Sequence, residues 1–139
     1  MINSSQALSK LGDPSLEKTM TIWVVPASLE IGVIPKKIYC NKAMVVPLSK
    51  AFKALIDTGK VNELKTWNGC FEVRKQRDAG VMSLHSWGLA IDVNASWNQM
   101  YTVGNLSPEF VKCFTDNGFD WGGNFHTRLD PMHFQLSSI

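Results

Sequence analysis

Two short stretches of the sequence carry residues that could bind a metal ion. His85 and Asp92 stand seven residues apart in SLHSWGLAIDVN, residues 83–94, and Asp130 and His133 stand three apart in DPMHFQ. A catalytic zinc typically has three nitrogen, sulfur or oxygen ligands from the protein and one open position for water. His85, Asp92 and His133 could supply three such donors, which would leave the Asp130 carboxylate near that water as a general base.

The chain between His85 and Asp92 must bring these two side chains together. On an unbroken helix, seven residues would separate them by about 10.5 Å along the axis, too far for a shared ion. Gly88 interrupts the segment, and the residues after it favour a strand. Alternate residues from Leu89 would then face the core, and Asp92 the opposite side. We expect Gly88 to let the preceding loop fold back and place His85 over Asp92.

The second pair is expected where a loop enters the last strand, because Pro131 is incompatible with a helix interior. Neither stretch alone shows whether its residues bind a metal ion. A single histidine is more often a surface or hydrogen-bonded residue than a ligand. An aspartate after an apolar run is commonly a turn or cap residue. From spacing alone, both interpretations stay open.

The remaining pattern predicts an α+β fold, with a short antiparallel sheet flanked by a few helices in one small domain over residues 1–139. Apolar residues at helical spacing after Pro47, and a Ser107 cap before Pro108, indicate two amphipathic helices. The expected helices span 4–12, 47–59 and 107–118; the expected strands span 19–25, 36–40, 63–73 with a bend at 68–69, 88–93 and 132–136.

Composition limits the classes of function. The formal net charge of +2 is too small to indicate nucleic-acid binding, though it would tolerate an anionic polymer such as a cell wall. Residues 1–10 lack the order of a signal peptide, and no apolar run approaches the length of a membrane span, so we expect synthesis in the cytoplasm without membrane insertion. The three cysteines are too scattered to predict a disulfide framework or a cysteine metal site.

The two stretches together resemble a known family. Ser83-x-His85-x-x-Gly88-x-Ala90-x-Asp92, followed by Asp130-x-x-His133, is similar to the zinc D-Ala-D-Ala carboxypeptidases and L-alanyl-D-glutamate endopeptidases. This family includes VanY-like carboxypeptidases, vancomycin-resistance dipeptidases and phage endolysins, and its fold is shared with the Hedgehog signalling domain. The flanks NGCFEVRKQRD and GFDWGGNF extend the resemblance, which covers about residues 67–136. No separate wall-binding domain is expected.

The resemblance implies one zinc ion held by His85, Asp92 and His133. It implies that Asp130 takes a proton from the zinc-bound water and passes one to the leaving amine. Arg74 aligns with an arginine that lies near the substrate carboxylate or the oxyanion, and a guanidinium can grip two oxygens of either group. An ordinary surface arginine is the alternative, and Arg77 and Ser83 are further candidates for substrate binding, although Ser83 could equally be a turn residue.

Two more candidates lie in the stretch before Asp130. His126 could replace a ligand, line the cleft or be a bystander of a mobile loop. Trp121, followed by two glycines, could form a cleft wall or pack in the core.

Three functions follow from the resemblance. The first is cleavage of the L-Ala-D-Glu bond in peptidoglycan stem peptides, as in a monomeric phage or prophage endolysin that reaches the wall through a holin pore or from a virion. Aspartate at position 130, where carboxypeptidases usually have glutamate, favours it. The second is a D-Ala-D-Ala carboxypeptidase or dipeptidase. The third is a non-catalytic zinc-binding module, against which Asp130 argues.

Overall fold

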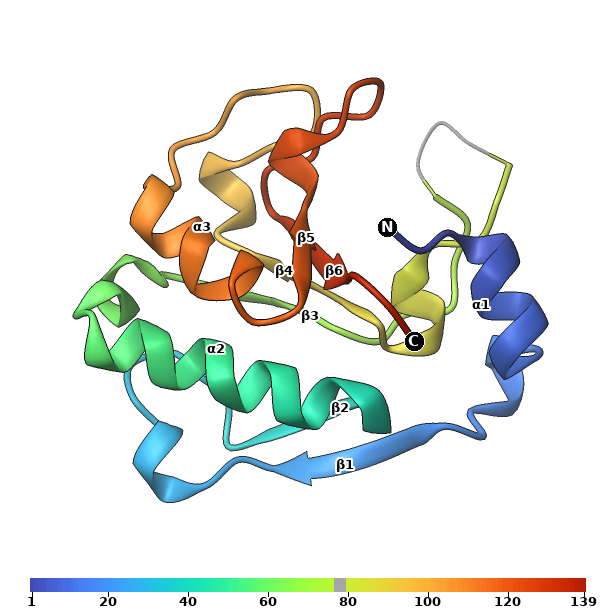
Figure 1. Ribbon diagram of the computed structural model, residues 1–139, viewed down its shortest axis with the longest axis horizontal. Helices are drawn as coiled ribbons and strands as arrows, with labels where there is room; N and C mark the ends of the chain where they lie inside the picture. Colours follow the sequence, from blue (N-terminus) through green and yellow to red (C-terminus); the bar gives the residue numbers. More distant parts are fainter. Residues whose placement is uncertain (77–79) are drawn as a thin grey trace.

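The strand that carries Asp92 lies inside a four-stranded antiparallel sheet. The computed structural model describes residues 1–76 and 80–139. The sheet has the order β3-β4-β6-β5, so that β4 and β6 are its two inner strands (Figure 1). Its strands are β3 (Trp67–Gly69), β4 (Ala90–Val93), β6 (His133–Leu136) and β5 (Phe119–Trp121).

One face of this sheet forms the apolar core. Ile91 in β4 and Phe134 in β6 are fully buried and paired in register. Helix α3 (Pro108–Thr115) covers this face, with the ring of Phe114 stacked on Phe134 at 4.5 Å between centroids. Helix α2 (Val45–Asp57) packs beside α3 and places Phe52 edge-on against Trp67. The predicted alternation in β4 is confirmed, because Asp92 is left for the opposite face.

The three predicted helices are confirmed with small shifts at their ends. Helix α1 (Ser4–Leu11) follows an Asn3 cap and ends at Gly12, and α3 follows the Ser107 cap, whose Oγ accepts from the Phe110 N–H. Helix α2 begins at Val45, two residues before the predicted start at Pro47. Proline is tolerated there because backbone N–H groups in the first turn have no acceptor within the helix.

The predicted α+β fold, with antiparallel strands flanked by a few helices, is confirmed, and its strands are divided between two sheets. Strands β1 (Met20–Val24) and β2 (Lys37–Asn41) form a separate antiparallel pair. The pair is linked to the turn before β4 by the Asn41 N–H, which donates to the Gly88 carbonyl at 3.1 Å. A Cβ atom at Gly88 would lie 2.6 Å from that nitrogen, and its φ of 65° also favours glycine.

Two expectations for the strands need correction. The predicted strand over 63–73 is reduced to Trp67–Gly69, because Lys60–Glu63 forms a 3-10 turn and the Asn94 side chain takes the Lys65 and Thr66 N–H groups. Strand β5 was not predicted; it follows directly after α3 and pairs with β6. Both differences arise from specific hydrogen bonds and strand pairing that local residue preference does not show.

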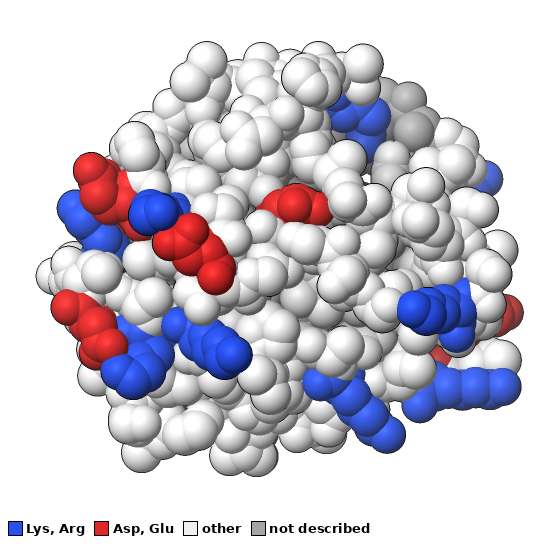
Figure 2. Space-filling model, in the orientation of Figure 1, with Lys and Arg blue, Asp and Glu red and all other residues white. Residues whose placement is uncertain are grey.

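The described surface carries charges of both signs. On the face in Figure 2, acidic and basic side chains are interspersed and form no continuous basic patch among the described residues. This agrees with the small formal net charge of +2. None of the described helices is long and apolar enough to cross a bilayer.

Candidate metal centre and active site

A tight turn before β4 positions His85. Residues Leu84–Trp87 form a 3-10 turn, in which the Ser83 Oγ accepts from the His85 N–H at 3.2 Å. Gly88 ends the turn in the left-handed conformation, and the chain then enters β4. The prediction that this glycine lets His85 fold back over Asp92 is confirmed, since His85 Nε2 lies 3.2 Å from Asp92 Oδ2.

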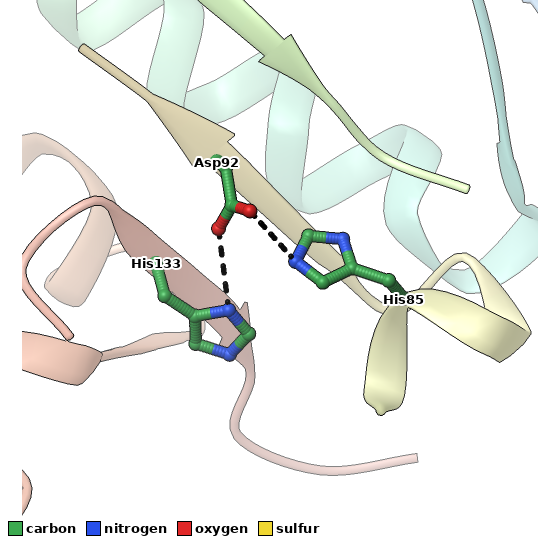
Figure 3. A group of neighbouring side chains, drawn as sticks. All are labelled: His85, Asp92 and His133. Atoms are coloured by element: carbon green, nitrogen blue, oxygen red, sulfur yellow. Dashed lines mark ion pairs between the residues drawn. The ribbon is translucent and has the colours of Figure 1, made fainter. Parts of the chain in front are cut away.

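His133 reaches the same carboxylate from the neighbouring strand. Asp92 and His133 are direct partners in the β4–β6 register, and His133 Nδ1 lies 3.4 Å from Asp92 Oδ1. Figure 3 shows the Asp92 carboxylate between the two imidazoles, one from the turn and one from β6. The structure therefore brings together three residues that are 7 and 41 positions apart in the sequence.

The second nitrogen of each imidazole is engaged elsewhere. His85 Nδ1 lies 2.8 Å from the Cys70 carbonyl oxygen, and His133 Nε2 lies 2.9 Å from Gln135 Oε1. A carbonyl oxygen only accepts, so each of these nitrogens carries the proton when the ring is neutral. His85 Nε2 and His133 Nδ1 then present their lone pairs toward Asp92, in the manner of metal-binding histidines that donate their other N–H to a carbonyl.

Charges around the site shift the pKa values of two of its members. Burial raises the pKa of Asp92, but hydrogen bonds and charge from His133 and His85 outweigh burial and hold it well below its usual range. Burial lowers the pKa of His133, but Asp92, Asp130 and Gln135 together raise it above its ordinary value. These shifts favour an ionised Asp92 and a protonated His133 when no metal is bound, so a metal that binds His133 must displace a proton from it.

The donors of this group fit a zinc ion. One ligand atom from each of His85, Asp92 and His133 lies within 4.8 Å of the others. Among the described atoms, His85 Nε2 and Asp92 Oδ1 are buried and have no hydrogen-bond partner beyond the contacts within this group, which is costly unless another group satisfies them. Two imidazoles and a carboxylate are the donor types of catalytic zinc sites, and a fourth position would stay open.

Asp130 lies in the same cavity as the three metal-binding candidates. The cavity holds about 60 Å³ and includes His85, Asp92, Asp130 and His133 in its lining. The Asp130 N–H donates to the Gly122 carbonyl at 2.9 Å, and the His133 N–H donates to the Asp130 carbonyl at 3.0 Å. These bonds fix the backbone of Asp130 relative to the metal centre.

Arg74 and Ser83 also line this cavity. The Arg74 guanidinium is about a quarter exposed and bonds to Glu72 through Nε at 3.1 Å. Its backbone N–H donates to Ser86 Oγ, and its carbonyl accepts from the same hydroxyl and from the Ser83 N–H. Ser83 is buried and caps the His85 turn, so its observed contacts orient the turn.

Trp121 and His126 line a larger, adjoining cavity of about 700 Å³ instead. Trp121 is half-buried, stacks against Phe134, and donates from its indole to the Pro131 carbonyl at 2.8 Å. His126 is exposed and does not join the described group of potential ligands. Arg77 lies outside the described residues.

Sequence reasoning missed three polar residues of the cavity, Gln76, Arg128 and Gln135. Arg128 lines both cavities and donates to Gln76 Oε1 at 3.0 Å. Gln135 could have been predicted from the sequence to line the cavity, because residues two apart on a strand share a face and His133 was already a candidate ligand. Arg128 lies in a loop without periodicity, where no sequence signal marks its direction.

Comparison with known proteins adds to this geometry. Residues 76–136 match the family model described as D-alanyl-D-alanine carboxypeptidase. The matched stretch, somewhat under half of the chain, includes both motifs and every ligand candidate, but not Arg74. Neither a curated protein nor a solved structure matches significantly. The match supports a metallopeptidase-type hydrolase similar to that family.

Proposed function

We propose that this protein is a zinc-dependent peptidase of the D-alanyl-D-alanine carboxypeptidase family that cleaves peptidoglycan stem peptides. The observation that carries the proposal is the convergence of His85, Asp92 and His133 on ligand atoms within 4.8 Å of one another, in the cavity that also contains Asp130. Asp130 favours a catalyst over a metal-binding module, since a carboxylate beside the ligands is the group that hydrolysis requires.

A bound zinc would supply Lewis acidity, polarising the scissile carbonyl and lowering the pKa of water. His85 would hold it through Nε2 and His133 through Nδ1, since their other nitrogens face Cys70 and Gln135. The Asp130 carboxylate would accept a proton from the attacking water and deliver one to the leaving amine. The backbone bonds to Gly122 and His133 keep Asp130 in place during both transfers.

Two arginines at the cavity suit a substrate that carries carboxylates. Arg74 lines the smaller cavity, with its Nε bound to Glu72 and its Nη1 donating to the Lys75 carbonyl, and Arg128 lines both cavities. A guanidinium can bind a carboxylate through two parallel hydrogen bonds. Either arginine could therefore hold a substrate carboxylate or the oxyanion that forms during hydrolysis.

For the bond that is cut, we propose the one between L-Ala and D-Glu, with a phage or prophage endolysin as the biological setting. Aspartate at position 130 supports this choice. Cleavage of terminal D-Ala is the second candidate, because the matching family model carries that description.

Digestion of purified peptidoglycan by the zinc-loaded protein tests both candidates. Mass spectrometry of the fragments should show stem peptides cut between L-Ala and D-Glu; release of free D-Ala would instead establish the carboxypeptidase. Absence of both products, with one zinc bound per chain, would leave a non-catalytic module and refute the peptidase.

A further inference from the structure

Gln135 is a buried glutamine that contacts His133 on the side away from Asp92. It follows His133 by two residues in β6, so both side chains lie on the same face of the sheet. Its Oε1 is 2.9 Å from His133 Nε2, and its Nε2 donates to the Ile2 carbonyl at 3.1 Å. Gln135 is 5% exposed and His133 is 8% exposed, so water does not readily replace either bond.

The direction of these two bonds sets the tautomer of His133. The Ile2 carbonyl can only accept, so the amide nitrogen of Gln135 must face it and the amide oxygen must face His133. That oxygen also only accepts, so His133 Nε2 must be the donor. A neutral His133 then has its lone pair on Nδ1, the atom 3.4 Å from Asp92. The opposite orientation of the amide would place two acceptors, the Gln135 oxygen and the Ile2 carbonyl, against each other.

The N-terminal segment is anchored by Asn3 and Ile2, so that the Ile2 carbonyl is a fixed acceptor for the Gln135 amide. Asn3 caps α1, its side chain accepting from the Gln6 N–H while its own N–H donates to Gln6 Oε1. The preceding Ile2 is 9% exposed and belongs to the core. Within the sheet, Gln135 is paired with the small Ala90 of β4, which leaves room for the amide, and with Asp120 of β5.

We infer that Gln135 is a positioning residue for the metal centre, and that it acts together with the Ile2 carbonyl by fixing His133 in the tautomer that presents Nδ1 to the metal. The inference rests on the proposed function for the identity of the metal. It extends the site from the two motifs to the segment that precedes α1. Partners of this kind typically change metal affinity about 10–100-fold when they are lost.

The test measures zinc affinity by competition with a chelator, and the His133 tautomer by 15N NMR of the metal-free protein at a pH where the ring is neutral. Gln135→Leu should bind zinc about 10–100-fold more weakly and should show both tautomers in place of Nε2–H alone. Gln135→Glu keeps an acceptor for His133 and should bind zinc more tightly than the leucine variant. The control Asn117→Leu removes a side-chain bond to the Cys113 carbonyl in α3 and should leave both readouts unchanged.

The role of Ile2 needs its own variant. Deletion of residues 1–3 removes the acceptor for the Gln135 amide and should also admit both tautomers, whereas Asn3→Ala weakens the α1 cap but keeps the Ile2 carbonyl and should admit only one. Unchanged zinc affinity and tautomer in Gln135→Leu would overturn the inference. Failure of the wild-type protein to bind one zinc would instead overturn the proposed function, so the two failures are distinct.

Discussion

Asp92 and His133 face each other as directly paired residues of β4 and β6, with 3.4 Å between Oδ1 and Nδ1. A sheet register is rigid, because a slip of one residue would turn every side chain of a strand to the other face. The same register buries Ile91 against the core and pairs it with Phe134. Packing of the core therefore also aligns two of the three ligand candidates.

Asp92→Asn should abolish tight zinc binding. The substitution keeps the size of the side chain but removes the anionic donor, and zinc then loses one of three protein ligands. We expect affinity to fall by more than the roughly 10–100-fold that loss of an outer partner causes, as measured by chelator competition. Asp57→Asn, which breaks an exposed ion pair with Lys53 on α2, serves as the control. Equal affinity in Asp92→Asn and wild type would contradict the assignment of this ligand.

Asp130→Asn should separate catalysis from metal binding. Loss of a general acid-base group lowers rates about 10²–10⁴-fold, while the three ligand candidates stay intact. The expected result is one zinc per chain by metal analysis, with hydrolysis of stem peptides reduced to that extent. Asp116→Asn, an exposed aspartate that pairs with Lys112, should retain full activity. If Asp130→Asn hydrolysed its substrate at the wild-type rate, another group would have to be the base.

The sequence was sufficient to predict the parts of the site that depend on local pattern. Alternation in β4 places Asp92 opposite the apolar face, and the left-handed Gly88 explains how His85 returns to it. That β1 and β2 form a sheet of their own was not predicted, because local pattern does not show which strands pair. Strand β5 has only three residues, too few for an alternating pattern to show. The contact of Gln135 with Ile2, 133 residues away, depends on the tertiary fold.

The metal-free protein should be most stable in mildly acidic solution. The pKa of Asp92 is lowered from 3.8. Its contribution to the free energy of unfolding is therefore complete above pH 3.8 and is lost as the pH falls through the folded-state pKa. The pKa of His133 is raised from 6.5, so its contribution is complete below that value and is lost as the pH rises through the folded-state pKa. The Asp92–His133 pair therefore stabilises the folded protein most between pH 3.8 and pH 6.5.

Chemical unfolding in the presence of a chelator, repeated across this range, checks the prediction. His133→Gln should lack the loss of stability on the alkaline side that wild type shows. Identical pH profiles for the two proteins would show that this pair does not set the pH dependence.

Gly122→Ala should impair activity through Asp130 while preserving the ligands of the metal. A Cβ atom at position 122 would lie 2.2 Å from the Asp130 carbonyl oxygen, closer than any real contact, and 3.1 Å from His133 Cβ. The nearer clash is with backbone that cannot rotate away, so the chain at Asp130 must move. Displacements of about 1 Å in a catalytic group can lower rates about 100-fold.

Steady-state hydrolysis measured beside zinc stoichiometry tests this expectation, with the loss predicted in kcat and one zinc still bound per chain. Gly80→Ala is the matched control, because a Cβ atom there meets nothing within 4 Å and the glycine has no positive φ. An unimpaired Gly122→Ala variant would mean that Asp130 tolerates displacement. That result would be incompatible with a base whose carboxylate must reach both the attacking water and the leaving amine.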